Sequence, residues 1–268
     1  APVARAAKKM GLPVMLVNLD AVAGRANRWL ARRADRVLSV YDQPGLPGQF
    51  ETIDFPLRAC VIGHTEPAEA RAALGLKPDP PTLLVTGASQ GARTINQACE
   101  ALARRGVLCD WQVLHLAGEG NVESVERAYR EQGVRGRVVP FLDQMHLAWS
   151  AADLAISRAG AGSVAEVTIN AVPAVFMPYP FHRDKHQRRN VEPLEHAGAA
   201  VIIDDHVDPL INATHLEPVL ASLRADKAAL RSMRNKLSAQ PAENGATRLA
   251  ALARDMLDRR ATLNGGRR

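Results

Sequence analysis

Short apolar segments alternate along the chain with stretches in which apolar side chains recur every three or four residues. Between residues 66 and 240 the apolar segments lie at 82–86, 111–116, 137–141, 154–157, 174–178 and 199–203. Helices are predicted to start near Arg93, Asn121, Gln144, Ser163 and Asp184. This alternation is typical of βαβ units in a parallel sheet. Six strands suffice for a complete doubly wound α/β domain.

The first 65 residues show the same pattern in a shorter form. Strands are predicted at 14–19, 36–41 and 51–56, with a helix at 24–34. Three parallel strands are too few for a stable open sheet. We therefore expect residues 1–65 to be the C-terminal part of an incomplete domain, in a chain that starts inside a longer protein. Residues 66–240 form the main domain, and 241–268 form a C-terminal helix and tail.

Composition narrows the possible environments of the protein. Apolar residues make up 47% of the chain but aromatic residues only 4%, which predicts an aliphatic core between sheet and helices. The formal charge of +6 indicates an anionic partner. Three cysteines without CxxC spacing fit a reducing cytoplasm. The sequence contains neither a membrane-spanning apolar run nor a signal-peptide pattern.

A glycine-rich turn, GASQGAR, directly follows the segment at 82–86 and precedes a predicted helix. Gly87 and Gly91 would permit close approach of the backbone to a ligand, and free amides at the helix start suit a phosphate. Ser89 would add a hydroxyl donor. An ordinary strand-to-helix turn explains the glycines equally well, because the spacing is neither GxGxxG nor a Walker motif.

A second junction, SRAGAGSVAEV, follows the segment at 154–157. Ser163 and Glu166 have the spacing of a capping box, in which Glu166 would bond only to an amide of its own helix. Local sequence favours that interpretation. The alternative is that Glu166 accepts hydrogen bonds from paired sugar hydroxyls at the carboxyl edge of the sheet, where open α/β folds bind ligands.

A third junction, PYPFHRDKHQRRN, follows the segment at 174–178. His182, Asp184 and His186 suggest a metal site, but alternate positions do not share one helix face, and no further ligand is evident. Gln187 and Asn190 lie three residues apart on one predicted face, where their amides could bond to sugar hydroxyls.

Together the three junctions, in this order, resemble the MurG-like transferases of glycosyltransferase family 28. AVAGRANRWLARRADRV and the step at 56–58 also match, so the resemblance covers nearly the whole chain. It implies a GT-B fold with two Rossmann-like domains, the N-terminal one incomplete here. It also implies transfer of N-acetylglucosamine from UDP-N-acetylglucosamine to undecaprenyl-diphosphate-muramoyl-pentapeptide in peptidoglycan synthesis.

The resemblance further implies roles for individual residues. Ser89 would contact the diphosphate and sugar, the backbone of Leu142 the uracil, and Arg58 the diphosphate. Glu166 would bind the ribose hydroxyls and Gln187 the N-acetylglucosamine. We expect neither a metal ion nor another cofactor. The predicted substrate-binding residues are Arg58, Ser89, Gln90, Leu142, Ala161, Gly162, Ser163, Val164, Ala165, Glu166, Gln187, Asn190 and, on the acceptor side, Asp20.

The acceptor side departs from the family pattern. Residues 17–20 read Val-Asn-Leu-Asp where the family usually has His-Glu-Gln-Asn, so Asp20 replaces an amide that can donate a hydrogen bond. The family's GGTGGH-like loop, which carries the usual candidate for the catalytic base, would lie upstream of residue 1. We therefore expect this chain alone to bind the donor with little turnover. A UDP-sugar epimerase of GT-B architecture and a non-catalytic UDP-sugar-binding module are the alternatives.

Arginines at 25, 28, 32 and 36 recur at helical spacing and predict a basic stripe. A solvated cationic face is one interpretation. A lipid-linked acceptor favours the other, which is contact with an anionic membrane surface. Nucleic acid is not expected, because no aromatic stacking platform accompanies the arginines. We expect a cytoplasmic protein that is peripheral to the cytoplasmic face of the inner membrane.

Overall fold

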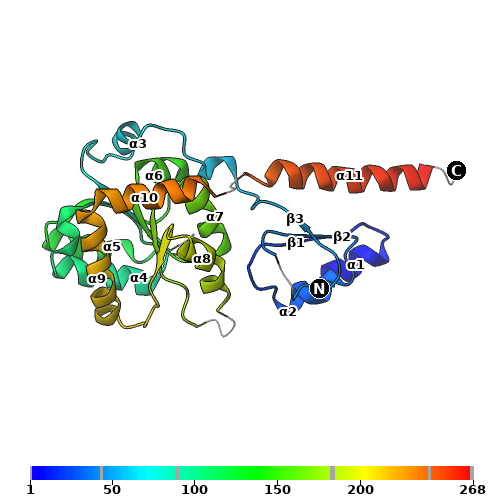
Figure 1. The fold of residues 1–268 in the computed structure, drawn as a ribbon, viewed down its shortest axis with the longest axis horizontal. Coiled ribbons are helices and arrows are strands. Elements are labelled where there is room, and N and C mark those ends of the chain that lie inside the picture. Colours follow the sequence, from blue (N-terminus) through cyan, green and yellow to red (C-terminus); the bar gives the residue numbers. More distant parts are fainter. Residues whose placement is uncertain (1, 43–44, 88–90, 182–184, 241–242, 266–268) are drawn as a thin grey trace. The chain divides into compact units, whose positions relative to one another are not determined.

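The computed structural model describes residues 2–42, 45–87, 91–181, 185–240 and 243–265, which belong to two compact units. The first unit combines residues 1–57 with residues 243–268, and the second comprises residues 58–242. Figure 1 shows both units, coloured along the sequence. The larger second unit contains the three junctions singled out in the sequence.

The second unit is built on a parallel sheet with the strand order β6-β5-β4-β7-β8-β9. The chain lays down β4, β5 and β6 toward one edge and then returns to place β7 on the other side of β4. This is the strand order of a doubly wound fold, with its reversal point between β4 and β7. The strands are β4 (Thr82–Thr86), β5 (Gln112–Leu116), β6 (Arg135–Val139), β7 (Leu154–Ser157), β8 (Ala174–Phe176) and β9 (Ala200–Ile202).

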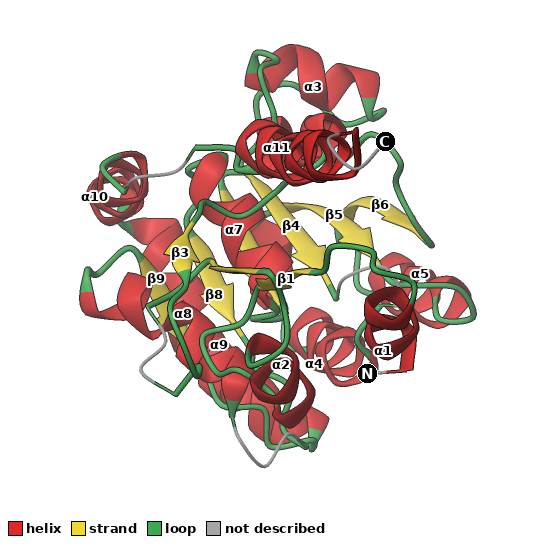
Figure 2. Ribbon diagram, turned by 90° about the vertical axis from the view of Figure 1, so that its right-hand side faces the viewer, coloured by secondary structure: helices red, strands yellow, loops and turns green. Residues whose placement is uncertain are grey.

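Helices cover both faces of this sheet (Figure 2). Because successive side chains of a strand point to opposite faces, Leu83 and Val85 join one buried core and Leu84 joins the other. The predicted aliphatic packing on both faces is therefore confirmed. The helices are α3 (Pro67–Ala73), α4 (Arg93–Arg104), α5 (Val122–Glu131), α6 (Met145–Ala151), α7 (Ala161–Ile169), α8 (His186–His196), α9 (Pro209–Ala225) and α10 (Lys227–Ser238), with the short 3-10 helices η1 (Ala59–Val61) and η2 (Val107–Asp110).

The first unit holds a small parallel sheet of order β1-β2-β3. Leu16, Ala23, Ala31, Val37 and Leu46 form its buried core. Its elements are α1 (Pro2–Lys9), β1 (Met15–Asn18), α2 (Arg25–Ala31), β2 (Arg36–Ser39), β3 (Glu51–Thr52) and α11 (Ala246–Gly265). None of the described helices is long and apolar enough to cross a membrane.

Both predicted domain boundaries shift in the structure. Residues 58–65 belong to the second unit, where Asn170 Oδ1 accepts a hydrogen bond from Gly63 N at 2.6 Å and Asn170 Nδ2 donates to Val61 O at 3.0 Å. The C-terminal helix belongs to the first unit, because Gly245 N donates to Phe55 O at 3.2 Å. Contacts between residues far apart in sequence thus set boundaries that the local pattern cannot indicate.

Candidate functional site

A cavity of about 480 Å³ opens in the second unit at the carboxyl ends of β4 and β7. This is the reversal point of the strand order, where open α/β sheets bind their ligands. All three junctions contribute to its lining, so the structure brings the first junction together with two that follow it much later in the sequence. Its lining residues include Gly87, Gly91, Arg93, Gly160, Ser163 and Gln187.

The glycines of the first junction leave no room for a side chain. A Cβ at Gly87 would lie 2.2 Å from Ala92 N, and one at Gly91 would lie 2.1 Å from Ala117 O. Gly91 also has a φ of +71°, which disfavours any residue with a Cβ. The turn therefore brings backbone against backbone at the end of β4. Ser89, the predicted diphosphate and sugar contact, and Gln90, another predicted substrate-binding residue, lie outside the described residues.

The second junction presents backbone amides. Gly160 is the N-cap of α7, and the amides of residues 161–163 have no hydrogen-bond partner in the part of the chain that the structure describes. The side chain of Ala161 is buried, so this residue offers a ligand only its backbone. Val164 is also buried, and its amide already donates to Gly160 O at 3.0 Å. Free amides at a helix start attract anionic groups.

Glu166 does not close a capping box, which corrects the interpretation favoured by local sequence. The helix starts at Ala161, two residues before the predicted start, so Ser163 lies inside the first turn and caps nothing. Instead, Trp149 Nε1 donates to Glu166 Oε2 at 2.9 Å. Burial raises the pKa of Glu166, against the opposing effects of the Trp149 hydrogen bond and the Arg58 charge.

At the third junction, one of the two side chains predicted to contact the sugar lies at the cavity and the other does not. Gln187 lines the cavity, and its Oε1 accepts a hydrogen bond from Tyr179 N at 2.9 Å. Asn190 is only 1% exposed and donates from Nδ2 to Ala159 O at 3.2 Å. It therefore supports the α7 turn from behind, contrary to its predicted contact with sugar hydroxyls. Tyr179 packs edge-on against Phe181, which is 63% exposed beside the cavity.

Arg93 is a cavity residue that the sequence reasoning missed. It is exposed at the start of α4, and no acidic side chain among the described residues pairs with it. Its guanidinium is thus available to an anionic ligand beside the free amides of α7. The sequence does contain a signal for it, since Arg93 ends the GASQGAR motif.

A buried ionic network lies behind this part of the cavity. Arg158 Nη1 donates to Asp205 Oδ2 at 2.8 Å, and Thr94 Oγ1 donates to the same oxygen at 2.5 Å. Burial alone would raise the pKa of Asp205, but bonds from Thr94, Arg158 and Asn212 hold it below its ordinary value. The network ties the first turn of α4 to the loops after β7 and β9. Fully bonded buried groups of this kind fix local geometry.

Glu166, Leu142 and Arg58 are predicted donor contacts that lie in the second unit outside the cavity lining. Leu142 is half-buried in the loop between β6 and α6, and its backbone amide and carbonyl are without partners among the described residues. Arg58 is exposed at the N-cap of η1, near enough to Glu166 to influence its pKa.

On the predicted acceptor side, Asp20 follows β1 in the first unit. Its carbonyl oxygen accepts a hydrogen bond from Asn18 Nδ2 at 2.8 Å. Asn18 is fully buried and also accepts from Asn27 Nδ2 at 2.9 Å, so it holds the loop in place. Burial and then the charge of Asp20 raise the pKa of Tyr41 to about 12. The Asp20 carboxylate therefore lies close to the Tyr41 hydroxyl.

A separate cavity of about 380 Å³ lies in the first unit, lined by residues of α1 and α2. The guanidinium carbons of Arg5 and Arg33 lie 4.9 and 4.1 Å from the ring centre of Trp29. Lys8, Lys9 and Leu30 also line this cavity.

The basic stripe predicted for the same helix is shorter than expected. Arg25, Arg28 and Arg32 are exposed. Arg36 instead pairs with Glu51 at 2.9 Å and with Asp255 at 3.4 Å, so it does not extend the stripe. It belongs to β2, where the chain has already left the helix.

The third junction also carries the possible metal site. His182 and Asp184 lie outside the described residues. Among the residues that are described, no group of three or more His, Cys, Asp or Glu side chains is arranged to hold a metal ion.

Comparison with known proteins places this geometry in a family. The family model described as the glycosyltransferase family 28 C-terminal domain matches residues 82–249. A relative from Clavibacter michiganensis subsp. michiganensis is 37% identical over 273 residues, covering 100% of this chain and 71% of the relative. A relative from Nocardioides sp. is 41% identical over 203 residues, which are 75% of this chain and 55% of that protein. Both are named UDP-N-acetylglucosamine--N-acetylmuramyl-(pentapeptide) pyrophosphoryl-undecaprenol N-acetylglucosamine transferase.

Solved structures agree with this match. The crystal structure of MurG from Acinetobacter baumannii is 28% identical, has a TM-score of 0.72, and is matched over 95% of this chain and 70% of that one. A glycosyltransferase of kitacinnamycin, 20% identical with a TM-score of 0.60, shares the fold. The chain thus spans between about half and three quarters of the proteins it matches, and its fold is of the predicted GT-B type. On these grounds the chain belongs to glycosyltransferase family 28.

Proposed function

We propose that this protein transfers N-acetylglucosamine from UDP-N-acetylglucosamine to undecaprenyl-diphosphate-muramoyl-pentapeptide, with the donor bound in the second unit. The observation that carries the proposal is the convergence of three strand-to-helix junctions on one cavity at the reversal point of the sheet. The printed names of the two bacterial relatives supply the substrate classes. The cavity supports binding of a UDP-sugar, and these names support the choice of acceptor.

The chemistry of the cavity suits departure of UDP. Negative charge develops on the diphosphate as the bond to the sugar breaks. The free amides of residues 161–163 and the guanidinium of Arg93 would stabilise that charge without a metal ion. We assign no general base in this chain. His115 is unsuited to the role, because burial lowers its pKa to about 3 and both ring nitrogens bond to Tyr129 and Asn96.

Individual donor contacts follow from groups that remain available. Only one carboxylate oxygen of Glu166 is bonded among the described residues, which leaves the other for the ribose hydroxyls. Gln187 Oε1 is occupied, so its Nε2 would donate to the sugar. We propose that the Leu142 backbone reads the uracil edge and that Arg58 adds charge at the diphosphate. Asp20 would face the acceptor.

Calorimetry with UDP-N-acetylglucosamine tests the donor site. Glu166→Ala should weaken binding by about 10- to 100-fold, because one charge-assisted hydrogen bond is worth about 1.5–3 kcal/mol. Glu166→Gln, which can still accept from Trp149, controls for disturbance of that contact. Glu126→Ala, an exposed substitution on α5, is the matched control and should leave affinity unchanged.

Two outcomes would contradict parts of this proposal. Unchanged affinity of the Glu166→Ala variant would remove Glu166 from the donor site. Conversion of UDP-N-acetylglucosamine without any lipid acceptor would indicate an epimerase in place of a transferase.

We further propose that the protein acts at the cytoplasmic face of the inner membrane, as a peripheral protein. The cavity around Trp29 combines an apolar floor with a cationic rim from Arg5, Lys8, Lys9 and Arg33. Such a combination suits acidic headgroups and the upper part of acyl chains. A lipid-linked acceptor would require the protein to work at this surface.

A further inference from the structure

A second cavity in the larger unit, of about 380 Å³, lies at the edge of the sheet opposite the donor cavity. Pro81 and Asp153, which directly precede β4 and β7, line it. The two cavities thus lie at opposite ends of the same pair of strands. Five cationic side chains and two carboxylates line this second cavity, leaving an excess of three positive charges. The cations are Arg71, Arg224, Lys227, Arg231 and Arg234.

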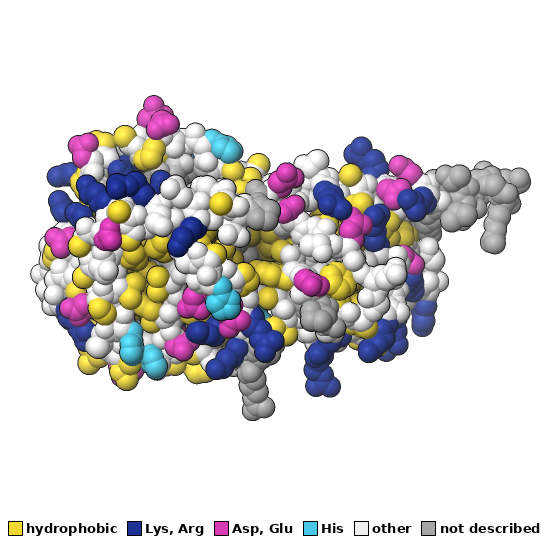
Figure 3. All heavy atoms as spheres, viewed as in Figure 1, with side chains coloured by type: hydrophobic (Ala, Val, Ile, Leu, Met, Phe, Trp, Pro, Cys, Tyr) yellow, Lys and Arg dark blue, Asp and Glu magenta, His cyan; other side chains and the backbone are white. Residues whose placement is uncertain are grey.

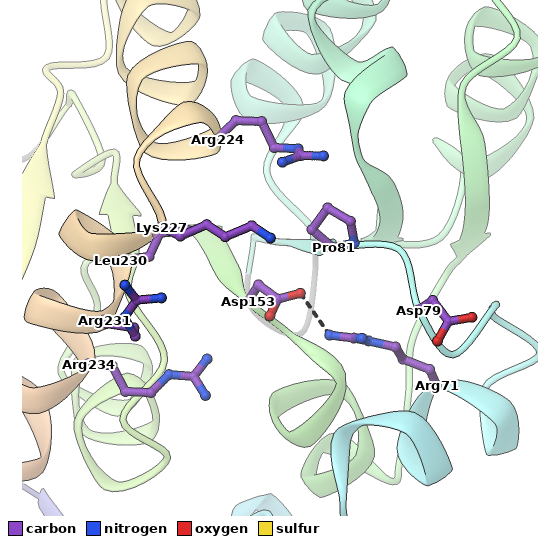
Figure 4. A pocket seen from close by; sticks show the side chains of 9 residues that line it. All are labelled: Arg71, Asp79, Pro81, Asp153, Arg224, Lys227, Leu230, Arg231 and Arg234. Carbon is purple, nitrogen blue, oxygen red and sulfur yellow. Dashed lines mark hydrogen bonds and ion pairs between the residues drawn. The ribbon is translucent and has the colours of Figure 1, made fainter.

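The cations are brought together from three helices. Figure 4 shows Lys227, Arg231 and Arg234 extending from α10 toward the side on which Arg71 and Asp153 meet. Their spacing of four and three residues places them on one face of that helix. In the space-filling view, Lys and Arg side chains gather in the region of α3 and the start of α10 (Figure 3).

Two of the arginines, Arg71 and Arg224, are held in place by hydrogen bonds to neighbouring residues. Arg71 is almost fully buried and donates to Asp153 Oδ2 at 2.7 Å, to Pro78 O at 2.7 Å and to Ala151 O at 3.0 Å. Arg224 Nε donates to Asp110 O at 3.0 Å, with its guanidinium 5.7 Å from the Trp111 ring centre. Their orientation is therefore set before any ligand arrives.

Lys227 and Arg231 are the two cations of this cavity that are most available to a ligand. Both are exposed, and neither has a hydrogen bond or ion pair with any described residue. Arg234 makes a single hydrogen bond to the described residues, a donation from Nη2 to Ala152 O at 3.4 Å. Like charges gathered around one cavity repel each other, so an anion placed between them would relieve that repulsion. The five cations outnumber the two carboxylates of the cavity, so the cavity is suited to bind an anion.

We propose that this cavity binds a ligand carrying two or more phosphate groups. Guanidinium and ammonium groups are the side chains that proteins use for phosphate, and several on different elements match a multivalent anion. A volume of about 380 Å³ lies in the range of small-molecule sites. The site is separate from the donor cavity and does not depend on the proposed transferase activity. The phosphates could belong to a soluble molecule or to lipid headgroups.

Binding assays with inorganic tripolyphosphate and with vesicles distinguish these two sources. The test variant is Lys227→Gln/Arg231→Gln, which removes two charges but keeps a polar side chain at both exposed positions. The control is Arg127→Gln/Arg130→Gln, which removes the same charge from the exposed face of α5. Calorimetry with tripolyphosphate, and sedimentation with phosphatidylglycerol or phosphatidylcholine vesicles, are measured for all three proteins. Unfolding midpoints confirm that the variants remain folded.

A site for soluble phosphates predicts that the test variant binds tripolyphosphate at least about tenfold more weakly, whereas the control binds like the original protein. A headgroup site predicts the same selective loss for phosphatidylglycerol vesicles and no binding to phosphatidylcholine. Either selective loss supports the proposal. Equal losses in both variants would reduce the effect to general surface charge and overturn it, as would the absence of binding to both anionic probes.

Discussion

At the scale of single residues, the two carboxylate oxygens of Glu166 have different surroundings, and its pKa is raised. One oxygen accepts from the Trp149 indole, and the other is unbonded among the described residues. Because burial raises its pKa above the ordinary 4.5, the carboxyl group takes up a proton at a higher pH than an exposed glutamate does. Only the ionised form accepts hydrogen bonds at every lone pair. Ribose hydroxyls should therefore bind best to the deprotonated site.

Donor affinity should consequently fall as the pH is lowered toward 4.5, and the fall should begin at a higher pH than an unperturbed glutamate would cause. The Glu166→Gln variant carries no titrating group at this position and should lose this part of the pH dependence. Calorimetric titration of UDP at several pH values measures both proteins. Parallel pH profiles would show that Glu166 does not contact the nucleotide.

The two errors at residue scale have separate physical causes. Ser163 and Glu166 have capping-box spacing, but this spacing does not show at which residue the helix begins. In the structure the helix begins at Ala161, and Gly160 is its N-cap. Gln187 and Asn190 do share a helix, yet Asn190 faces the core and Gln187 the cavity. Motif spacing locates a junction well. It does not decide which side chain of the junction reaches a ligand.

At the scale of elements, the turn between β4 and α4 depends on glycine for two different reasons. Gly91 has a positive φ, and its α-carbon also lies against the backbone of Ala117 at the end of β5. Gly120 has a similar φ of +79° but open space around the place of a Cβ. The pair therefore separates the effect of backbone strain from that of steric overlap.

Gly91→Ala should destabilise the fold more than Gly120→Ala. Both substitutions should lower the free energy of unfolding by about 1–2 kcal/mol, because a residue with a Cβ must adopt a left-handed conformation. Only Gly91→Ala also places a Cβ 2.1 Å from Ala117 O. The turn must move to relieve that overlap, so donor affinity should fall as well. Urea unfolding and calorimetry with UDP measure the two effects. Equal unfolding free energies for the two variants would refute the steric argument.

The elements themselves were largely predictable, because buried parallel strands are short apolar runs between helical stretches. The prediction for β4 matches the structure at both ends, and β5 differs by one residue. The partition into units was not predictable in the same way. Arg248 in α11 pairs with Glu51 at 2.6 Å across nearly 200 residues of sequence, and no local pattern encodes that contact.

At the scale of the whole molecule, the net charge of +6 is spread over distinct surfaces. One basic region surrounds Trp29 in the first unit, and another surrounds the cavity beside α10. The donor cavity is lined by Arg93 and by Arg158, which pairs with Asp205. Composition indicates an anionic partner but cannot divide the charge among sites. Residues 71, 153 and 224–234 become neighbours only through the sheet and its covering helices.

The exposed stripe of Arg25, Arg28 and Arg32 in the first unit should bind anionic membranes through charge. Removing the exposed stripe with Arg25→Ala/Arg28→Ala/Arg32→Ala should weaken binding to phosphatidylglycerol vesicles by about 3 kcal/mol, since each basic residue near such a surface contributes about 1 kcal/mol. A control triple variant, Arg127→Ala/Arg130→Ala/Lys236→Ala, removes equal charge from exposed positions of the second unit. Vesicle sedimentation at low and high salt measures both, and salt should erase most of the difference. Equal binding of the original protein to neutral and anionic vesicles would contradict a role for charge. An equal loss of binding in the control triple variant would show that the stripe has no special role in membrane contact.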